Sequence, residues 1–381
     1  MNGNEAVVLN SQQLLFQKIK ESSPVSKQQL RTDTGLSWAV VSDSVNKLVD
    51  TGYIVPYGKQ QSQGAGRKAD EYDINSQKNY FIGIDLNDMG VLCVVTDMKG
   101  RIVKQCEKEF ALRERDHVLE QLYGVIDKFF EEFQSNQILG IGIAAQGVVD
   151  LIEGNSICIH KIKNWNNVPL KELFEERYGV MTNVLHDPDC LMKTETVFGC
   201  LKSSDVSNTI MVFISHRTGI GMSIMINDQI YHGCHGKAGE IGYTIVRDEE
   251  NNSVGLLEEY VTKSGILREY SRIKQEDEEI SYREFVERLQ NRDEICSKVY
   301  KQLGEYIGFA VSSAANFLNP ELIVIHASHC DYPEILYETI SDFVTKNTYD
   351  KTVELRLSGL GRSAIAIGSA LTAIEKAIQK I

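Results

Sequence analysis

The sequence predicts an α/β protein in which an N-terminal winged helix-turn-helix precedes a two-lobed domain. Three observations lead to this fold class. The first 76 residues read as short helices and a hairpin, a strand meander starts near residue 80, and a similar meander returns about 130 residues later. The length of 381 residues fits such a division, because one ordinary domain holds roughly 100–200 residues.

The composition is that of a globular chain. Hydrophobic residues make up 42% and charged residues 24%, with only 6 prolines, which excludes a disordered chain or a collagen. No run approaches the ~20 apolar residues of a membrane span, and the first residues do not resemble a signal peptide. We therefore expect a cytoplasmic protein with no membrane partner. The 8 cysteines are scattered without a CxxC pair, which predicts reduced thiols.

Charge is unevenly distributed along the chain. Residues 1–80 carry 9 Lys and Arg against 8 Asp and Glu, whereas the remaining residues carry 31 against 45. A strongly acidic body repels nucleic acid. Only the N-terminal segment is therefore suited to contact DNA.

Three short helices are predicted in the first 50 residues. The first begins at Ser11 and ends before Pro24. The second is capped by Ser26, with Gln29 completing a capping box, and the third is capped by Ser37. The third helix places three apolar residues on its buried face: Val41, Val45 and Leu48.

Two strand-like pieces, 53–55 and 71–74, follow these helices and are joined by a Gly-, Gln- and Ser-rich loop. A generic three-helix bundle would show the same apolar spacing, but the basic residues of this loop favour a winged helix that binds DNA. Ser42 and Asn46 are expected to read base edges, Lys47 to contact a phosphate, and Arg67 to enter the minor groove. The full set of candidate DNA contacts is Ser37, Trp38, Ala39, Ser42, Asp43, Asn46, Lys47, Arg67 and Lys68.

The rest of the chain alternates strands and helices. Strands at 80–86, 91–96 and 101–110 form a meander, followed by a helix at 117–133 and a buried strand at 138–144. The same order of strands and turns returns later in the chain. Strands are predicted at 211–215 and 222–226 with a glycine turn at 218–221 between them, and a further strand at Ile230. This repeat indicates two similar lobes around a cleft. The predicted domains are 1–76, 77–185 with a C-terminal helix 363–381 packed on it, and 186–362.

Several motifs carry a resemblance to a known family. They include GIGIAAQGVVD at 140–150, NWNNVPL at 164–170, an Asp after a buried strand, TGIG at 218–221, GEIG at 239–242 and NPE at 319–321. In this order they resemble the ROK family of repressors, open reading frames and sugar kinases, and most closely its repressor branch of xylose and N-acetylglucosamine type. The resemblance implies an actin-like, ribonuclease-H-like fold for both lobes.

The candidate sugar site combines residue chemistry with this resemblance. Asp187 follows a strand, where α/β proteins bind ligands, although a helix cap or a surface acid would look the same. In the family its position holds the acid that activates a sugar hydroxyl. Glu240 and Glu258 could be solvated surface acids, but they match the family's sugar-binding glutamates. The complete candidate set is Gly147, Lys161, His186, Asp187, Glu240, Tyr243 and Glu258.

The family's phosphate-binding machinery is degenerate in this sequence. Its kinases carry D-x-G-G-T-K after the first strand, where this chain has Asp-Leu-Asn-Asp-Met-Gly at 85–90. Asp88 adds a negative charge where a phosphate would bind, so we expect poor ATP binding and no catalytic residue. Paired glycines near the C-terminus are replaced by His326 and Ala327.

The family's structural zinc is also predicted to be absent, and no other cofactor is expected. Tyr243 replaces the histidine ligand, and residues 247–255 contain no cysteine. Side chains of the kind that bind zinc are present nearby, at His232, Cys234 and His235. Neighbouring residues rarely converge on one ion, however, and no fourth ligand is near in sequence.

These features predict a sugar-responsive transcriptional regulator that binds an inverted-repeat operator as a homodimer or higher oligomer. The enzyme alternative is a ROK-type sugar kinase with an added N-terminal domain. A third reading is a sugar-responsive scaffold that no longer binds DNA.

Overall fold

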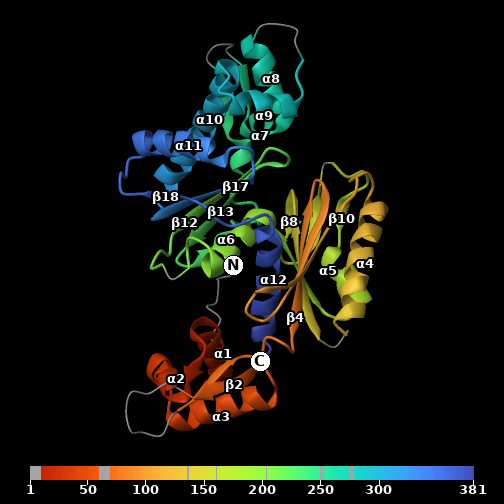
Figure 1. Ribbon diagram of the computed structural model, residues 1–381, viewed down its shortest axis with the longest axis vertical. Helices are drawn as coiled ribbons and strands as arrows, with labels where there is room; N and C mark the ends of the chain where they lie inside the picture. The colour runs from red at the N-terminus through yellow and green to blue at the C-terminus, as the bar shows by residue number, and fades with distance from the viewer. Residues whose placement is uncertain are drawn as a thin grey trace.

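The computed structural model describes residues 10–59, 69–134, 137–159, 161–202, 204–248, 253–274 and 279–381. Figure 1 shows a small N-terminal unit, here called the head, at one end of an elongated molecule. Two sheets with their helices form the rest, and we call them the first and second lobes. The long C-terminal helix runs between these lobes and points toward the head.

The head contains the helices and the hairpin expected from the sequence. A three-stranded sheet in the order β1-β3-β2 packs beside three helices. Ser26 and Ser37 accept hydrogen bonds from Gln29 N and Val40 N and so cap the second and third helices. The elements are α1(Ser11–Ser22), β1(Val25–Ser26), α2(Lys27–Thr34), α3(Trp38–Asp50), β2(Ile54–Lys59) and β3(Asp70–Ile74).

One detail of the head differs from the sequence prediction. The expected capping box at Ser26 is only half formed, because the Gln29 side chain donates to Asp33 Oδ1 at 2.6 Å instead of folding back on the cap. A complete capping box closes the start of α1, where Asn10 and Gln13 bond each other's backbone N–H groups.

The first lobe is built on a five-stranded sheet in the order β11-β7-β4-β5-β6. Strands β4, β5 and β6 form the predicted antiparallel meander, and β7 and β11 add parallel strands beside β4. A helix, α4, covers the outer face of this sheet. The bounds are β4(Tyr80–Asn87), β5(Gly90–Thr96), β6(Ile102–Glu109), α4(Arg115–Glu132), β7(Ile138–Ala145) and β11(Met181–His186).

The second lobe repeats this topology. Its sheet has the order β14-β13-β12-β17-β18, with an antiparallel meander and two parallel strands in the same relative places. The internal duplication predicted from the sequence is therefore confirmed. The bounds are β12(Thr209–Ser215), β13(Gly219–Ile226), β14(Gln229–Ile230), β17(Leu322–His329) and β18(Glu354–Leu357).

The glycine turn predicted at 218–221 begins two residues earlier, at residue 216. Gly219 and Gly221 are already paired with Ser215 and Phe213 in the ladder between β12 and β13. The turn itself is made by residues 216–218. Both glycines are therefore strand residues, because the antiparallel register continues to Gly219.

The remaining elements surround the two sheets. In the first lobe they are β8(Val148–Asp150), β9(Asn155–Cys158), β10(Asn166–Val168) and α5(Leu170–Tyr178). In the second they are η1(Ile241–Tyr243), β15(Ile245–Asp248), β16(Ser253–Leu256), α7(Leu257–Val261), α8(Lys263–Lys274), α9(Tyr282–Gln290), α10(Glu294–Leu318) and α11(Pro333–Asn347). Helices α6(Asp187–Phe198) and α12(Ala364–Ile378) lie between the sheets.

Glycines allow the central helix α12 to approach its neighbours closely. A Cβ on Gly83 or Gly142, in β4 and β7, would collide with the carbonyl oxygens of Ala366 and Ser369 in α12. A Cβ on Gly368 would collide in turn with Cys190 of α6. These contacts fix α12 against the first sheet, as the sequence analysis expected for the C-terminal helix.

The core of the head continues into α12. One buried cluster joins Leu15, Phe16 and Ile19 of α1 to Leu371 and Ile374 of α12. The side chain of Gln13 also donates to the carbonyl oxygen of Gln379 at 2.8 Å. The head is thus packed against the C-terminal helix rather than tethered loosely to it.

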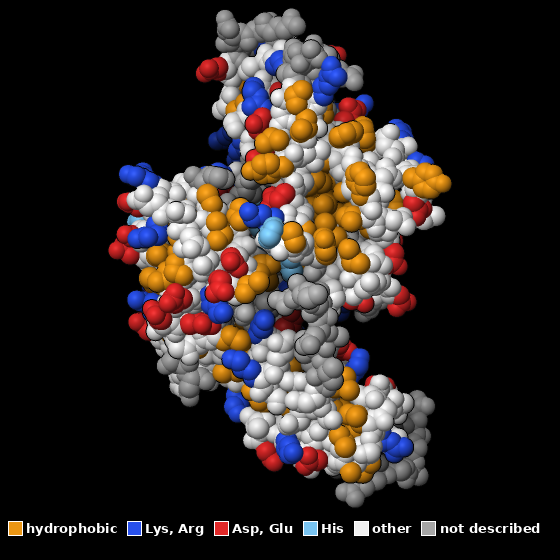
Figure 2. All heavy atoms as spheres, turned by 180° about the vertical axis from the view of Figure 1, so that it is seen from behind, with side chains coloured by type: hydrophobic (Ala, Val, Ile, Leu, Met, Phe, Trp, Pro, Cys, Tyr) orange, Lys and Arg blue, Asp and Glu red, His pale blue; other side chains and the backbone are white. Residues whose placement is uncertain are grey.

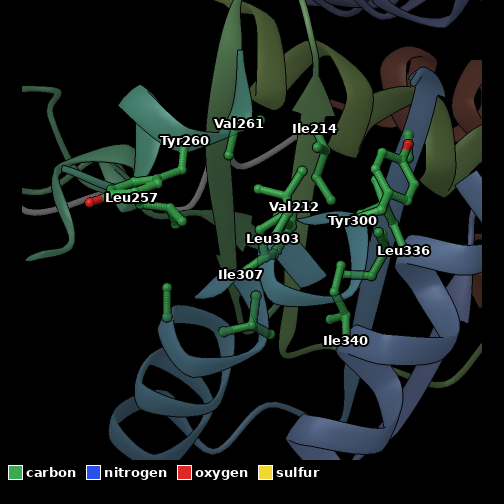
Figure 3. Packing of buried hydrophobic residues seen from close by; sticks show 14 of the residues in the cluster. Val212, Ile214, Leu257, Tyr260, Val261, Tyr300, Leu303, Ile307, Leu336 and Ile340 are labelled. Atoms are coloured by element: carbon green, nitrogen blue, oxygen red, sulfur yellow. The ribbon is translucent and has the colours of Figure 1, made fainter. Parts of the chain in front are cut away.

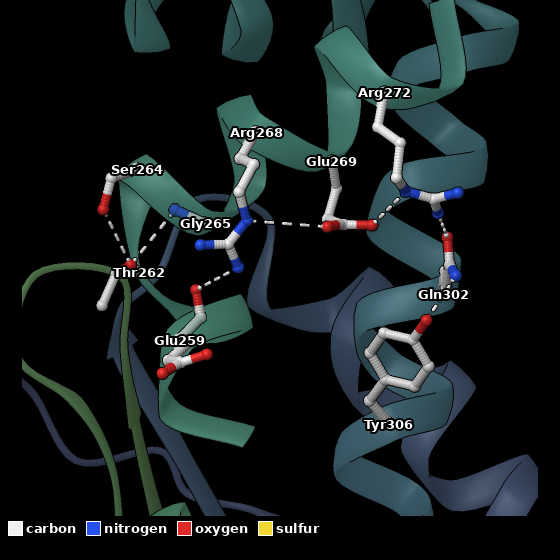
Figure 4. A network of polar contacts seen from close by, with 9 residues as sticks. All are labelled: Glu259, Thr262, Ser264, Gly265, Arg268, Glu269, Arg272, Gln302 and Tyr306. Carbon is white, nitrogen blue, oxygen red and sulfur yellow. Dashed lines mark hydrogen bonds and ion pairs between the residues drawn. The ribbon is translucent and has the colours of Figure 1, made fainter. Parts of the chain in front are cut away.

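The second lobe has the largest apolar cluster among the described residues. Strand β12 contributes Val212 and Ile214, which face Leu303 and Ile307 of α10 (Figure 3). A polar network ties α8 to its neighbours, since Arg268 donates to the carbonyl oxygen of Glu259 at 3.1 Å (Figure 4). These contacts make a rigid support for one side of the cleft.

The described part of the chain contains no helix that is both long and apolar enough to cross a membrane.

Candidate functional site

Asp187 occupies the place that the sequence predicted, at the carboxyl end of a parallel strand. Strand β11 ends at His186, and Asp187 begins α6. The side chain is buried, and burial raises the pKa of its carboxyl above the ordinary value. His186 opposes this rise, with its Nε2 atom 3.4 Å from Asp187 Oδ1. A carboxyl in this setting can accept a hydrogen bond from a ligand hydroxyl and take up its proton.

A second carboxylate, that of Asp189, lies two residues further along α6. Ser223 of β13 donates to Asp189 Oδ1 at 2.6 Å, and His232 Nδ1 lies 3.3 Å from Asp189 Oδ2. Burial alone would raise the pKa of Asp189, but the hydrogen bonds from His232 and Ser223 bring it below the ordinary value. In the sequence His232 suggested only a metal ligand, and its pairing with Asp189 was not predictable, because only the fold brings the segment after β14 to α6.

Glu240, Tyr243 and Glu258 gather around the short helix η1. Glu240 precedes η1 and is exposed, and its charge contributes to the raised pKa of Asp187. Tyr243 ends η1 with 58% of its surface exposed. Glu258 lies in the first turn of α7, where its Cβ is 3.2 Å from the position of a Cβ on Gly242. The GEIG loop and Glu258 are therefore brought together.

Gly147 and Lys161, two of the candidate sugar contacts, lie against other residues of this chain. Gly147 has a φ of 73°, and a Cβ there would collide with the carbonyl oxygen of Cys158. The glycine is thus required by the approach of neighbouring backbone. Lys161 Nζ donates to the carbonyl oxygen of Arg217 at 2.9 Å and lies 3.7 Å from Asp88 Oδ2.

A small cavity lies between the lobes beside Asp187. Its volume is about 20 Å³, which is room for about one water molecule. Burial raises the pKa of the Asp85 carboxyl to about 7 and lowers that of His329 to about 4. The cavity lining also includes residues from both sheets and from the start of α12: Asp88, Glu107, Gln146, Ser215, Arg217, Thr218, Arg362 and Ile365.

The hydroxyl of Thr218 is one group in this lining whose hydrogen bonding is incomplete. It is buried and has no hydrogen-bond partner among the described residues. A buried polar group without a partner costs free energy unless a ligand or water supplies one. Thr218 and Asp187 both line the cavity, which gives the site a donor and an acceptor for a hydroxylated ligand.

Sequence reasoning missed Arg217, His329 and Arg362 as site residues. His329 ends β17 and Arg217 lies in the turn two residues after β12, and this is the signal that could have found them, since strand ends line the cleft. No local pattern marks Arg362, which reaches the cavity because it immediately precedes α12.

The candidate DNA-binding residues lie on one exposed face of α3. Val41, Val45 and Leu48 are fully buried, as predicted, and the opposite side is open. Trp38 is 51% exposed at the start of the helix. Ser37, Ala39, Asp43, Asn46 and Lys47 are exposed and Ser42 is half-buried.

Two features of this face were not visible in the sequence. Asp43 is paired with Lys47 at 2.9 Å, so neither charge is isolated. Lys27, which begins α2, contacts Ser42 and Asn46. Arg67 and Lys68, the predicted wing contacts, lie outside the described residues.

The described residues contain no group of three or more His, Cys, Asp or Glu that could hold a metal ion. Cys234 and His235 are exposed, and His232 is directed to Asp189.

Relatives of known sequence cover nearly the whole chain. The xylose repressor of Bacillus subtilis (strain 168) is 26% identical over 380 residues, which cover 97% of this chain and 96% of that protein. The DNA-binding transcriptional dual regulator NagC of Escherichia coli (strain K12) is 26% identical over 352 residues, covering 87% of this chain and 83% of NagC.

Solved structures share the fold. A ROK family transcriptional regulator, described as a homolog of the E. coli MLC protein, superposes with a TM-score of 0.80 at 23% identity and covers 97% of this chain and 96% of that chain. A ROK family glucokinase from Streptomyces griseus, in complex with glucose and AMPPNP, has a TM-score of 0.64 at 19% identity and covers 77% and 98%. The model of the ROK family matches residues 81–376, and the chain therefore belongs to the ROK family.

Proposed function

We propose that this protein is a sugar-responsive transcriptional repressor that no longer acts as a kinase. The observation that carries the proposal is that similarity to repressors includes the head. The xylose repressor aligns along 97% of this chain, whereas the glucokinase structure covers 77%. In the head, a helix, a turn, a second helix and a hairpin follow one another as in a winged helix-turn-helix, and α3 has an exposed face.

The geometry of the first β-hairpin supports the loss of kinase activity. Asn87 and Gly90 are paired across a tight turn, and Met89 N donates to Asn87 Oδ1 at 3.0 Å, so this backbone amide is already satisfied. Asp88 points its carboxylate toward Lys161 instead of leaving a positive site for phosphate. Phosphoryl transfer needs backbone amides and cations directed at the nucleotide phosphates.

The region expected to hold the nucleotide base is also filled. His326 is buried in β17, where burial lowers the pKa of its ring to about 3. Its two ring nitrogens bond the hydroxyls of Ser328 at 2.7 Å and Ser358 at 3.1 Å. A sugar panel with millimolar ATP tests the kinase alternative, because turnover near 1 s⁻¹ lies in the usual kinase range and would contradict the repressor-only proposal.

In the proposed mechanism a sugar binds between the lobes beside Asp187. Hydroxyls of the ring bond Asp187, Thr218 and the exposed Glu240, and the lobes, which leave room for about one water molecule in this structure, open to admit the ring and then close around it. Because α12 contacts both the cleft lining and the core of the head, closure changes the position of the head without any sugar touching DNA. The proposed domains remain 1–76, 77–185 with 363–381, and 186–362.

Operator reading requires two heads, since one winged helix contacts only a few base pairs. We therefore propose a homodimer on an inverted repeat. Hydrophobic side chains gather over the half of the molecule that holds α10 and α11 (Figure 2). Phe309 and Phe317 of α10 are 50% and 88% exposed, which makes this face the proposed contact with a second copy.

Calorimetry tests the sugar site. A thermal-shift screen of xylose, glucose and N-acetylglucosamine first selects the best ligand, because a ligand that binds the native state raises its melting temperature. Asp187→Asn should then weaken binding by about 1.5–3 kcal/mol through loss of charge-assisted hydrogen bonds, with basal DNA binding unchanged. Glu120→Gln, an exposed change on α4, is the matched control. Equal affinity in wild type and Asp187→Asn would place the effector elsewhere.

The wing has its own test. Arg67→Ala should weaken operator binding by about 1–3 kcal/mol if its guanidinium enters the minor groove. Unchanged affinity would show that the wing does not contribute to binding.

A further inference from the structure

Lys27 lies at the junction of three elements of the head. It is the first residue of α2, and its Nζ atom is 2.8 Å from Asn46 Oδ1 and 3.2 Å from Ser42 Oγ, both on α3. The same ammonium group is 5.7 Å from the centre of the Tyr72 ring on β3. Both α3 partners belong to the face expected to read base edges, and Lys27 itself is half-buried.

The chemistry of an ammonium group sets the direction of these bonds. Lysine has three donor hydrogens and no acceptor, so Asn46 must turn its oxygen toward Lys27 and its NH₂ group away. Ser42 likewise accepts from Lys27, which leaves its own hydroxyl hydrogen to point elsewhere. Two of the three ammonium hydrogens are used in this way. Lys27 keeps one donor hydrogen, Ser42 its hydroxyl hydrogen and Asn46 its NH₂ group, so the donors that remain for a base outnumber the single lone pairs left on Ser42 Oγ and Asn46 Oδ1.

The charge of the same face favours the same conclusion. The acidic side chain nearest in sequence, Asp43, is paired with Lys47 at 2.9 Å. Lys27 adds a positive charge between Ser42 and Asn46. Base amino groups, which adenine and cytosine present in the major groove, are repelled by such a surface, whereas guanine presents two acceptors, N7 and O6.

We propose that Lys27, Ser42 and Asn46 form one donor set that selects guanine in each half-site, with Lys27 as the residue that sets the preference. This inference rests on the proposed DNA-binding function. A lysine that contacts phosphate behaves differently. Its removal weakens binding equally for all DNA sequences and reduces the slope of log affinity against log salt concentration by about one.

The test begins with selection of DNA from a random library by the full-length wild-type protein. Anisotropy titrations then measure affinity for the selected operator and for a panel in which each position carries each of the four bases. We expect one position per half-site where wild type prefers guanine over adenine by about tenfold. Lys27→Met should abolish this preference at that position, and Lys27→Arg, which keeps the charge and the donors, should retain it.

Two further variants keep the result interpretable. Lys18→Met on α1 is the matched control, since Lys18 pairs with Glu21 and should leave every preference unchanged. Asn46→Ala, an exposed change, should reduce the same guanine preference and so replaces Lys27→Met if thermal melting shows that the latter is unfolded. Uniform weakening on all sequences in Lys27→Met would overturn the proposal in favour of a phosphate contact. Failure of wild type to select any DNA would instead overturn the proposed function itself.

Discussion

The ammonium group of Lys161 lies 2.9 Å from the carbonyl oxygen of Arg217 and joins the two lobes across the cleft. Lys161 precedes β10 in the first lobe, and Arg217 lies in the turn before β13 in the second. Asp88 stands 3.7 Å from the same ammonium group. A residue expected to contact sugar thus bridges the lobes in this structure, and a ligand that displaces it changes how the lobes are held.

Lys161→Met should loosen this bridge. Because 52% of the Lys161 side chain is exposed, we expect the free energy of unfolding to fall by only ~1 kcal/mol. Hydrogen exchange at residues 216–218 should rise about fivefold while the melting temperature changes by roughly 2 °C or less. Lys163→Met, an exposed change two residues away, is the control. Equal exchange rates in the two variants would contradict a role for the bridge.

Asp85→Asn should change the pH dependence of stability. Burial raises the pKa of Asp85 from 3.8 to about 7, so the folded protein keeps a proton that the unfolded chain releases near pH 4. Its contribution to stability is therefore present at low pH and lost as the pH rises through 7. Chemical denaturation should show that the free energy of unfolding of Asp85→Asn, relative to that of wild type, rises by about 2–3 kcal/mol between pH 5 and pH 8. A pH-independent difference would show that Asp85 is ionised throughout.

Gly142→Ala should destabilise the protein and impair the head. A Cβ at this position collides with the carbonyl carbon and oxygen of Ser369 in α12, and because these are backbone atoms, the helix must move. We expect a loss of about 3 kcal/mol or more, with weakened operator binding because α12 completes the core of the head. Gly361→Ala has open space around its Cβ and serves as control. Denaturation and anisotropy on the same samples decide the result.

Phe317→Glu should convert the proposed dimer to monomers. Phe317 is 88% exposed on α10, and a charge there cannot be buried against a second copy without a large desolvation cost. Sedimentation at micromolar concentration should show half the wild-type mass. The variant should still unfold in a cooperative thermal transition, which shows that the monomer is folded. Ile152→Glu, at 83% exposure in the first lobe, should remain dimeric. A monomeric wild type, with or without DNA, would contradict the dimer proposal.

Periodicity predicted most of the fold. The apolar spacing of Val41, Val45 and Leu48 placed α3 and its buried face correctly, and strand alternation placed both meanders. Asp187 was located for the same reason, because a buried strand before it fixes which end of the sheet it occupies. Local signals of this kind are contained within about ten residues of sequence.

Relationships between distant residues could not be predicted in this way. Gly147, a candidate sugar contact, and Gly239 of the GEIG motif both have a positive φ, and each makes room for backbone of this chain, at Cys158 and Met222. A glycine in sequence does not reveal which of these neighbours it faces. The bond from Lys27 to Asn46 likewise depends on how α2 crosses α3, which periodicity leaves open.

The packing of α12 against α1 has a consequence for biosynthesis. The head leaves the ribosome first, yet part of its core is supplied by Leu371 and Ile374, close to the end of the chain. Domains generally fold as units during synthesis, but this one cannot complete its interior until α12 has been synthesised. A chain truncated before α12 therefore lacks part of the interior of the head, and under the proposed function α12 must be in place before the head binds an operator.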